Sequence, residues 1–268
     1  MPKRSHELQR LEAEIAGTQV IVPAGGQAKR FGYSDLPKAL LPFDSKTLID
    51  HQLEFLAASG FHDFVLLTGH FAEKLEAHVG TGSRFGLKVR YCRDPRGLVA
   101  VGRAKAIKNA VAEGVIDRGR RALLAYPDDV FFDRTLPYRL ISHHLAAVQS
   151  FRAVGTILLV SGRHYPFGVV RQIDHSGRAK DWEEKPLLNL PTYTGIGVFE
   201  PPFFKMIEED VDMKSKKAVE PETLIFPKLT EEGRLATMLI PPEIWCSIND
   251  PKEYEAALAR AKAGERAK

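Results

Sequence analysis

Short apolar runs alternate with helical segments over the first half of this chain of 268 residues. The runs lie at residues 19–22, 64–68, 87–92 and 122–126, and each has the length of a buried strand. The helical segments lie at residues 5–16, 47–59, 73–78 and 102–113. This alternation predicts an α/β protein in which helices cover both faces of a parallel sheet. Such sheets bind ligands at the carboxyl ends of their strands.

The second half of the chain has a different pattern, in which strands follow one another more closely. We expect strands at residues 156–160, 168–173, 179–183, 193–199, 235–239 and 245–248, and helices at 203–208, 222–229 and 251–261. No linker or internal repeat separates the halves. We therefore expect a single domain over residues 19–268, with one shared sheet and a lid for a second substrate, preceded by a helical extension over residues 1–18.

A glycine loop with three nearby cations follows the first strand. Gly25 and Gly26 let the backbone turn and approach a ligand closely, and Lys29, Arg30 and Lys38 follow them. Free backbone N–H groups and cations together are typical of a polyphosphate site, although the glycines alone would also fit a surface turn. The P-loop is excluded because it needs Gly-Lys-Ser/Thr, and the G-x-G-x-x-G dinucleotide pattern is absent.

Composition favours a small anionic substrate over nucleic acid. The net charge of +4 is modest, its excess lies largely at the two ends of the chain, and no basic stripe carries interleaved aromatic residues. Cys92 and Cys246 both lie in predicted strands, which is typical of reduced thiols. No apolar run has the length of a membrane span, and the N-terminus lacks the apolar region of a secretory signal. We therefore expect a cytoplasmic protein that does not contact membranes.

The pattern A-G-G-x-x-x-R, followed by P-K and L-L-P, resembles the sugar-phosphate nucleotidylyltransferases, or nucleoside-diphosphate-sugar pyrophosphorylases. The chain departs from them at Ala28-Lys29, where Gly-Thr is usual. The resemblance implies a three-layer α/β/α, Rossmann-like sandwich of the nucleotide-diphospho-sugar transferase type, with a mixed, mostly parallel central sheet. It also implies that the nucleotide is bound by Ala24, Gly25, Gly26, Lys29, Arg30, Gly97 and Gly102.

The start of the helix predicted at 102–113 resembles, more loosely, the family element that contacts the base. Gly-Thr-Ala-Gly-Ala is usual there, whereas this chain has Gly-Arg-Ala-Lys-Ala. The departure leaves the identity of the base open. We expect Arg103 and Lys105 to add two cations near the crevice.

Two acids, Asp128 and Asp129, come directly after the buried strand at residues 122–126. A carboxylate at such a strand end is costly unless it is paired or bound to a metal, although Asp there can also cap a turn. The resemblance implies that this acid holds Mg²⁺ on the nucleotide phosphates, and we favour Asp128 over Asp129.

The second half carries the elements that the resemblance assigns to the sugar phosphate. The Glu-Lys-Pro at residues 184–186 matches a family motif whose Glu holds sugar hydroxyls and whose Lys contacts the sugar phosphate. Those roles would belong to Glu184 and Lys185, although this stretch also fits a solvated charge run. Gly168 and Thr194 match two further elements on the sugar side.

The C-terminal element W-C-S-I-N-D-P resembles a family segment, Trp-x-Asp-Ile-Gly-Thr-Pro, whose Asp is the second metal ligand. Ser247 stands at that position here. Some branches of the family, such as the N-acetylglucosamine uridylyltransferases, use an Asn for this role, so we favour Asn249 as the substitute. Asp250 is next, and it fits a helix cap almost equally well.

The resemblance implies in-line attack by a sugar 1-phosphate on the α-phosphorus of a nucleoside triphosphate, with pyrophosphate as the leaving group. The nucleophile is already an anion, so catalysis reduces to positioning and charge neutralisation. We expect Arg30 to contact the β- and γ-phosphates, Lys38 the α-phosphate and Lys185 the sugar phosphate. Mg²⁺ would bind at Asp128 and Asn249. Arg30, Lys38, Asp128 and Lys185 are thus the expected catalytic residues.

The expected substrates follow from the resemblance alone. UTP or dTTP with glucose 1-phosphate is favoured, and GTP with mannose 1-phosphate is next. Residues 19–150 would bind the nucleotide and residues 151–268 the sugar phosphate, in a chain that could form a homo-oligomer. Two alternatives stay open: a cytidylyltransferase acting on a non-sugar phosphate, and a non-catalytic nucleotide-sensing subunit of the same fold.

Overall fold

A central sheet of seven strands organises the molecule. The computed structural model describes residues 6–95, 97 and 101–266. In spatial order the strands are β14 (Leu235–Ile240), β8 (Gly155–Val160), β13 (Thr192–Phe199), β6 (Ala122–Ala125), β1 (Gln19–Pro23), β4 (Asp63–Thr68) and β5 (Lys88–Arg93). Every neighbouring pair is parallel except those that β13 makes with β6 and β8. The predicted mixed, mostly parallel sheet shared by both halves is confirmed.

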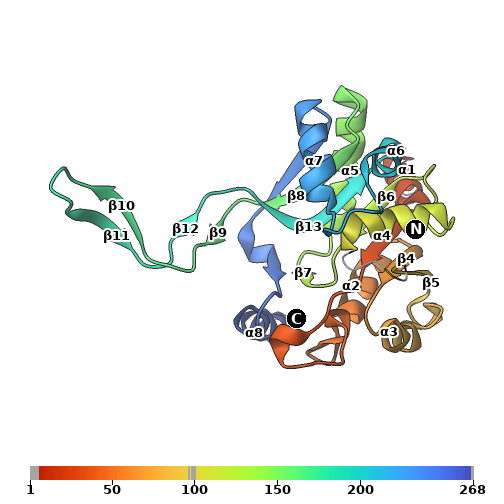
Figure 1. The fold of residues 1–268 in the computed structure, drawn as a ribbon, viewed down its shortest axis with the longest axis horizontal. Coiled ribbons are helices and arrows are strands. Elements are labelled where there is room, and N and C mark those ends of the chain that lie inside the picture. The colour runs from red at the N-terminus through yellow and green to blue at the C-terminus, as the bar shows by residue number, and fades with distance from the viewer. Residues whose placement is uncertain (1–5, 96, 98–100, 267–268) are drawn as a thin grey trace.

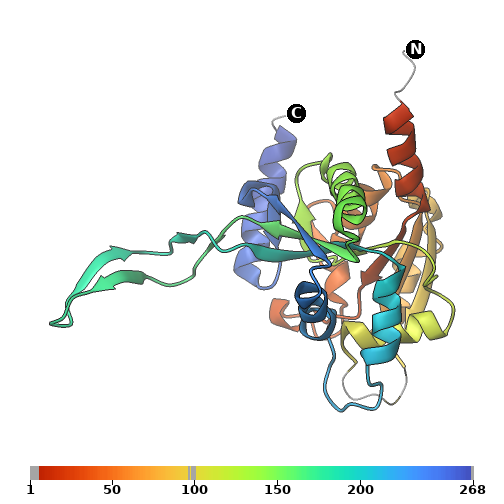
Figure 2. The same cartoon turned by 90° about the horizontal axis from the view of Figure 1, so that it is seen from above.

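Helices cover both faces of this sheet (Figure 1, Figure 2). One face carries α1 (His6–Gly17), α2 (Leu48–Ala57), α3 (Ala72–Val79) and α5 (Leu136–Phe151). The other carries α4 (Gly102–Ala112), α6 (Pro201–Asp210) and α7 (Pro221–Glu231). Strand β1 shows why both faces are buried, since Val20 and Val22 join the first core and Ile21 joins the second. The result is the predicted three-layer sandwich.

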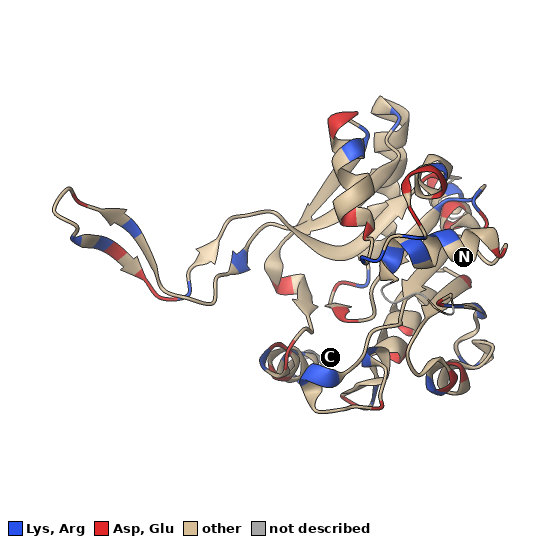
Figure 3. Cartoon of the chain, viewed as in Figure 1, with Lys and Arg blue, Asp and Glu red and all other residues tan. Residues whose placement is uncertain are grey.

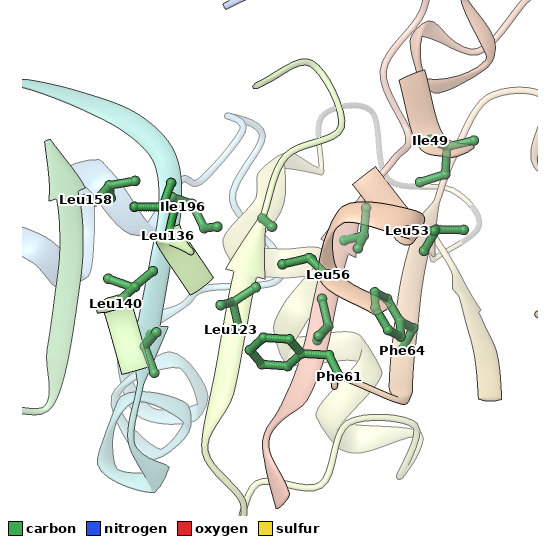
Figure 4. Close-up of a cluster of buried hydrophobic side chains, with 14 of the residues drawn as sticks. Ile49, Leu53, Leu56, Phe61, Phe64, Leu123, Leu136, Leu140, Leu158 and Ile196 are labelled. Carbon is green, nitrogen blue, oxygen red and sulfur yellow. The ribbon is translucent and has the colours of Figure 1, made fainter. Parts of the chain in front are cut away.

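The first core holds most of the large aliphatic side chains. Figure 4 shows Leu53 and Leu56 of α2 beside Phe64 of β4 and Leu123 of β6. All four are at most 1% exposed. Burying each such side chain contributes about 1.5–3 kcal/mol, so this layer fixes how α2 lies on the sheet.

One helix was missed by the sequence prediction, and the structure shows where the predicted N-terminal helix packs. Helix α5 was not predicted, although Leu136, Leu140, Ile141 and His144 form its buried stripe. The N-terminal helix α1 was predicted, and its Ile15 is fully buried in the core of its own chain. The extension is thus part of the body of the molecule.

A long arm leaves the body between β8 and β13 (Figure 1, Figure 2). We define the arm as residues 163–188. Its first ladder pairs β9 (Arg163–His164) with β12 (Leu187–Leu188), and its second pairs β10 (Val169–Ile173) with β11 (Ala179–Glu183). Strands were predicted at 168–173 and 179–183, and the structure places them outside the central sheet.

The C-terminal region lies at the carboxyl end of the central strands, near the end of β6. Strand β15 (Trp245–Ser247) pairs antiparallel with β7 (Asp129–Phe131), the short strand that follows β6. Helix α8 (Pro251–Arg266) then packs near the hairpin of β2 (Pro42–Phe43) and β3 (Lys46–Thr47). This pairing places the C-terminal motif, W-C-S-I-N-D-P, at the same end of the sheet as the glycine loop. Among the described helices, none has both the length and the apolar character that crossing a membrane requires.

Candidate active site

A cavity of about 1030 Å³ lies at the carboxyl ends of the parallel strands. Its walls come from the loops after β1, β4, β5 and β6, from the start of α4 and of α7, from β13 and from the C-terminal motif. Its size suits a nucleotide together with part of a second ligand. Among the predicted site residues, those that line it are Ala24, Gly25, Gly26, Lys38, Gly102, Asp128, Thr194 and Asn249.

The glycine loop is anchored so that two of its backbone N–H groups stay free. The N–H of Ala24 donates to the carbonyl of Leu67 at 2.8 Å, and the N–H of Lys38 donates to the carbonyl of Gly26 at 2.8 Å. No described residue accepts a hydrogen bond from the N–H of Gly25 or Gly26. A Cβ on Gly25 would lie 3.1 Å from the backbone nitrogen of Gly69, so this close packing favours glycine. The loop can therefore present N–H donors to an anion.

The departure at Ala28-Lys29 has a structural basis. Ala28 is fully buried and packs in a small core with Leu41 and Ile248. Lys29 and Arg30 follow in a short 3₁₀ helix, and both side chains are exposed. Neither makes a hydrogen bond or ion pair with the described residues, and neither is among the lining residues of the cavity. The two cations thus stand free beside the loop.

Three polar side chains from distant parts of the chain converge in the cavity. The Lys38 ammonium donates to Asp128 Oδ2 at 2.5 Å and to Asn249 Oδ1 at 3.3 Å. The two oxygens face one cation, so they are placed to share a metal ion as well. Within the described chain, no group of three or more His, Cys, Asp or Glu side chains could hold a metal. Mg²⁺ commonly takes one or two protein ligands and fills its shell with phosphates and water, so this donor pair fits it.

Asp129 has a different environment from its neighbour. Its Oδ1 accepts a hydrogen bond from Trp245 Nε1 at 2.9 Å. Burial, with the charge of Asp128 beside it, raises the pKa of Asp129 well above its usual range. The two adjacent acids therefore differ in role, with Asp128 facing Lys38 and Asp129 bonded to the strand that carries the C-terminal motif.

The C-terminal motif is held by an acid that sequence reasoning missed. Glu253 Oε2 accepts from the N–H of Asn249 at 2.9 Å and from the hydroxyl of Ser247 at 3.3 Å. Asp250 Oδ1 accepts from the N–H of Glu253 at 2.8 Å. Asp250 thus caps α8, which is the second of the two roles that the sequence predicted for it. Glu253 thus orients Asn249 toward the cavity.

Of the two cations expected near the crevice from α4, Arg103 lines the cavity and Lys105 is not among its described lining residues. Lys105 is fully buried, and its ammonium donates to the carbonyls of Ser215 at 2.6 Å and Lys217 at 2.9 Å. Arg103 lines the cavity but is ion-paired with Glu220 at 2.6 Å and Glu222 at 3.2 Å. Carboxylates at the start of α7 thus pair with Arg103, and carbonyls of the loop before α7 hold the Lys105 ammonium.

Three predicted sugar-side residues lie on the arm and are absent from the described lining of the cavity. Gly168 packs against Trp182, since a Cβ on it would lie 2.2 Å from that ring. Lys185 has a half-exposed side chain and a 3.5 Å ion pair with its neighbour Glu184. Thr194 does line the cavity, and its hydroxyl donates to the carbonyl of Leu158 at 3.0 Å. Gly97, predicted to lie near the base, has a positive φ and is also not among the described lining residues.

Two tyrosines that the sequence did not single out, Tyr126 and Tyr193, also line the cavity. The hydroxyl of Tyr126 donates to Glu222 Oε1 at 2.6 Å, and the Arg103 guanidinium lies 4.5 Å from the centre of the Tyr126 ring. Burial raises the pKa of Tyr126 and Tyr193 well above the usual range, so both stay neutral phenols. The two acids at residues 220 and 222, at the start of α7, were the sequence signal that could have indicated this part of the cavity.

Charges of both signs surround the cavity without forming a uniform field. Figure 3 shows basic residues along α4, acidic residues at the start of α7 and mixed charge on the arm. Each Lys or Arg that lines the described cavity has a carboxylate partner: Lys38 with Asp128, Arg93 with Glu73 and Glu76, Arg103 with Glu220 and Glu222, and Arg163 with Glu253.

Comparison with known proteins identifies relatives over nearly the whole chain. The family model for nucleotidyl transferases matches residues 19–263. The mannose-1-phosphate guanylyltransferase catalytic subunit beta of Drosophila pseudoobscura pseudoobscura is 25% identical over 245 residues, which cover 89% of this chain and 61% of that protein. The UTP–glucose-1-phosphate uridylyltransferase of Synechocystis sp. is 26% identical over 240 residues, which cover 83% of this chain and 57% of that protein. The chain thus spans about three fifths of the length of these curated relatives.

Solved structures share the fold. A putative glucose-1-phosphate thymidylyltransferase from Bacillus anthracis, in complex with a sucrose, has a TM-score of 0.69 at 22% identity over 91% of this chain and 95% of that one. HddC from Yersinia pseudotuberculosis has a TM-score of 0.64 at 19% identity over 91% of this chain and 99% of that one. These structures support the Rossmann-like arrangement of the sheet and helices.

Proposed function

The chain belongs to the nucleotidyl transferase family, and we propose that it transfers a nucleotidyl group from a nucleoside triphosphate to a sugar 1-phosphate, releasing pyrophosphate. The observation that carries the proposal is the convergence of Lys38, Asp128 and Asn249 beside the free N–H groups of the glycine loop. Cation, carboxylate and amide from three distant segments meet where the fold binds ligands.

The reaction needs positioning and charge neutralisation more than proton transfer. The sugar 1-phosphate oxygen attacks the α-phosphorus of the triphosphate, and the bond from that phosphorus to the oxygen bridging to the β-phosphate breaks. The N–H groups of Gly25 and Gly26 orient the triphosphate, with Arg30 beside its β- and γ-phosphates. Lys38 exchanges its contact with Asp128 for the α-phosphate. Mg²⁺ bound at Asp128 and Asn249 would supply further neutralisation of phosphate charge.

The names of the relatives bear on the choice of base and sugar. Mannose-1-phosphate guanylyltransferases from Drosophila, Danio rerio and Arabidopsis thaliana match this chain, together with a UTP–glucose-1-phosphate uridylyltransferase. We therefore place GTP with mannose 1-phosphate first. UTP or dTTP with glucose 1-phosphate, which the sequence favoured, comes second.

A pyrophosphate-release assay tests the proposal. Four nucleoside triphosphates are paired with glucose, mannose and N-acetylglucosamine 1-phosphates and with phosphocholine. The variant Lys38→Ala should lower turnover of the best pair by roughly 100-fold or more, because it removes a preorganised charge from the transition state. Lys46→Ala is the matched control, since Lys46 is exposed and pairs with Glu54 away from the cavity. Near-normal turnover by Lys38→Ala contradicts the proposed role.

One observation favours a second candidate, a nucleotide-sensing subunit without catalysis. The described lining of the cavity does not include Lys185, the cation expected at the sugar phosphate. Tight binding of a triphosphate without turnover of any sugar phosphate would support that candidate. Turnover with phosphocholine alone would instead support the cytidylyltransferase alternative.

A further inference from the structure

The arm carries most of the large apolar side chains that the body of the molecule leaves uncovered. Phe167, Ile173 and Trp182 are 66%, 71% and 66% exposed. Among the described large hydrophobic residues, the one other that is more than 60% exposed is Leu190, which lies just beyond the arm. Exposed apolar side chains that gather on one element indicate an interaction surface.

The outer part of the arm also has two open strand edges. We define the distal ladder as β10 and β11, which pair with each other and with no other described strand. Two views of the molecule show this ladder standing away from the body (Figure 1, Figure 2). A two-stranded ribbon is at best marginally stable alone in water, and an open edge offers its N–H and C=O groups to another strand. The distal ladder would therefore gain stability from a further strand.

The Trp182 ring has a fixed place on the distal ladder. Trp182 lies opposite Val170, and Gly168 leaves the space that the ring occupies, since a Cβ on Gly168 would lie 2.2 Å from the ring. The ring thus packs against its own ladder while about two thirds of the residue stays open to solvent. A rigid, exposed aromatic side chain of this kind is typical of the anchors that dominate stable interfaces.

The root of the arm directs the distal ladder away from the body. The N–H of Tyr165 donates to the carbonyl of Pro186 at 2.9 Å and extends the ladder of β9 and β12. Arg163, on β9, is ion-paired with Glu253 of α8. Because these contacts point the distal ladder outward, a second molecule is better placed to cover it than the body of the same chain.

Charge narrows the choice of that molecule. Basic and acidic residues balance between positions 165 and 185, where Arg171, Arg178, Lys180 and Lys185 stand against Asp174, Asp181, Glu183 and Glu184. A neutral arm lacks the positive charge that attracts nucleic acid or an anionic membrane surface. Strand β11 has Lys180 near its start and the two glutamates at its end, so two copies of it are complementary when they run antiparallel. The partner that fits is a second copy of this chain.

We propose that two copies of the chain dimerise through their arms, with the free edges of two β11 strands paired antiparallel. The pairing has twofold symmetry, so each contact occurs twice. It brings Lys180 of each copy beside Glu183 and Glu184 of the other, with the two Trp182 side chains close to the centre. An interface of standard size takes about 20–30 residues from each partner, which is about the length of the arm. The contact uses the distal ladder and does not depend on the reaction.

Sedimentation of the full chain over a range of concentrations tests the proposal. The wild type should show an equilibrium between monomer and dimer. Lys180→Glu should raise the dimer Kd about tenfold or more, because like charges then meet in both symmetric contacts. Trp182→Ser should raise it about 30-fold or more, because the central anchor is lost. Both side chains are exposed, so the body should stay folded.

Two exposed residues of the body provide matched controls. Lys205→Glu reverses a charge on α6, and Phe151→Ser removes an exposed aromatic side chain at the end of α5. Both variants should dimerise as the wild type does. A monomeric wild type at every concentration, or a dimer that Lys180→Glu and Trp182→Ser leave unchanged, overturns the proposal.

A mixture of two charge variants tests the antiparallel pairing itself. Lys180→Glu and Glu184→Lys should each dimerise weakly alone, since each brings like charges together. In an equimolar mixture every reversed charge meets its opposite on the other chain, so the Kd of the mixed dimer should return to within about threefold of the wild-type Kd. A mixture that associates no more tightly than the separate variants overturns the pairing of β11 with β11.

The fluorescence of Trp182 reports where the contact lies. The other tryptophan, Trp245, is only 8% exposed. Dilution that dissociates the dimer should shift the emission to the red as Trp182 becomes open to water, and Trp182→Phe should abolish the shift. Dissociation without a shift overturns the placement of Trp182 at the interface. A monomeric wild type whose emission shifts to the blue on anionic phospholipid vesicles would overturn the second copy in favour of a membrane surface.

Discussion

The Lys38 ammonium donates a hydrogen bond to Asp128 Oδ2 at 2.5 Å, although ninety residues separate the two in the chain. Both side chains are mostly buried, at 19% and 26% exposed. Asn249 completes the group at 3.3 Å from the same ammonium. A cation thus occupies the point on which two oxygen atoms converge. The proposed binding of phosphate and metal requires this cation to move aside or change partners.

Asp128→Asn should lower pyrophosphate release on the order of 100-fold or more, because it removes the negative charge that would hold the metal. The Mg²⁺ concentration needed for half-maximal rate should rise as well. Pyrophosphate release measured over a series of Mg²⁺ concentrations checks both. Asp133→Asn is the control, since Asp133 bonds Thr135 and Arg139 away from the cavity. A variant with wild-type rate and Mg²⁺ dependence would remove Asp128 from the metal site.

Lys185→Ala should raise KM for the sugar phosphate about tenfold. Every Lys or Arg in the described lining of the cavity already has a carboxylate partner, so the second phosphate needs a further cation. Lys185 has a single loose partner, and Arg163 at the root of the same arm lines the cavity. We therefore expect the arm to bend toward the cavity when the sugar phosphate binds. Steady-state kinetics should compare KM for the sugar phosphate in Lys185→Ala and in Lys180→Ala, which changes another lysine of the arm. Equal effects of the two variants would contradict a specific role for Lys185.

Gly102→Ala should destabilise the fold far more than Gly114→Ala. Both glycines have a positive φ, of 71° and 68°, so each substitution carries a backbone strain of about 1–2 kcal/mol. A Cβ on Gly102 would also lie 2.4 Å from the carbonyl oxygen of Val219, whereas a Cβ on Gly114 meets nothing within 4 Å. Overpacking adds about 1–3 kcal/mol, which urea denaturation would detect. Equal losses of stability in the two variants would mean that the loop before α7 shifts to accommodate the new Cβ at little cost.

The buried His144 should make the fold less stable in mild acid. Burial lowers its pKa below the usual value, while hydrogen bonding to Glu200 at 3.1 Å partly opposes the shift. The unfolded chain therefore takes up the proton more readily than the folded one. Stability from this group is complete above the ordinary histidine pKa of about 6.5 and is lost as pH falls below it toward the folded value.

His144→Gln should flatten this part of the pH dependence. The group contributes at most about 1.4 kcal/mol per pH unit, which urea denaturation between pH 7.5 and 5.5 can resolve. His143→Gln is the control, because His143 is exposed and lies on the same helix. A steeper pH dependence in His144→Gln would contradict the assignment.

Much of the fold could be predicted from local patterns. The apolar runs at β1, β4 and β6 are short and bounded by turns, and each became a central strand. Helix α5 was missed because Pro137 lies in its first turn and His144 lies in its buried stripe, which hides the periodicity of Leu136, Leu140 and Ile141. The arm strands were found, but their separation from the sheet could not be, since strand propensity does not specify a partner strand.

The sequence by itself predicted the seven strands of the central sheet and the turn at the glycine loop. It also predicted that Lys38, Asp128 and Asn249 would lie in one site. Only the tertiary structure decided what surrounds each charge. Lys105 and Arg103 look like ligands for phosphate in the sequence, yet carbonyls and carboxylates more than a hundred residues away satisfy them. Tyr193 carries no motif, yet its side chain lines the cavity. The physical reason is that the charge and hydrogen-bonding state of a side chain depend on its neighbours in space, which local sequence patterns do not encode.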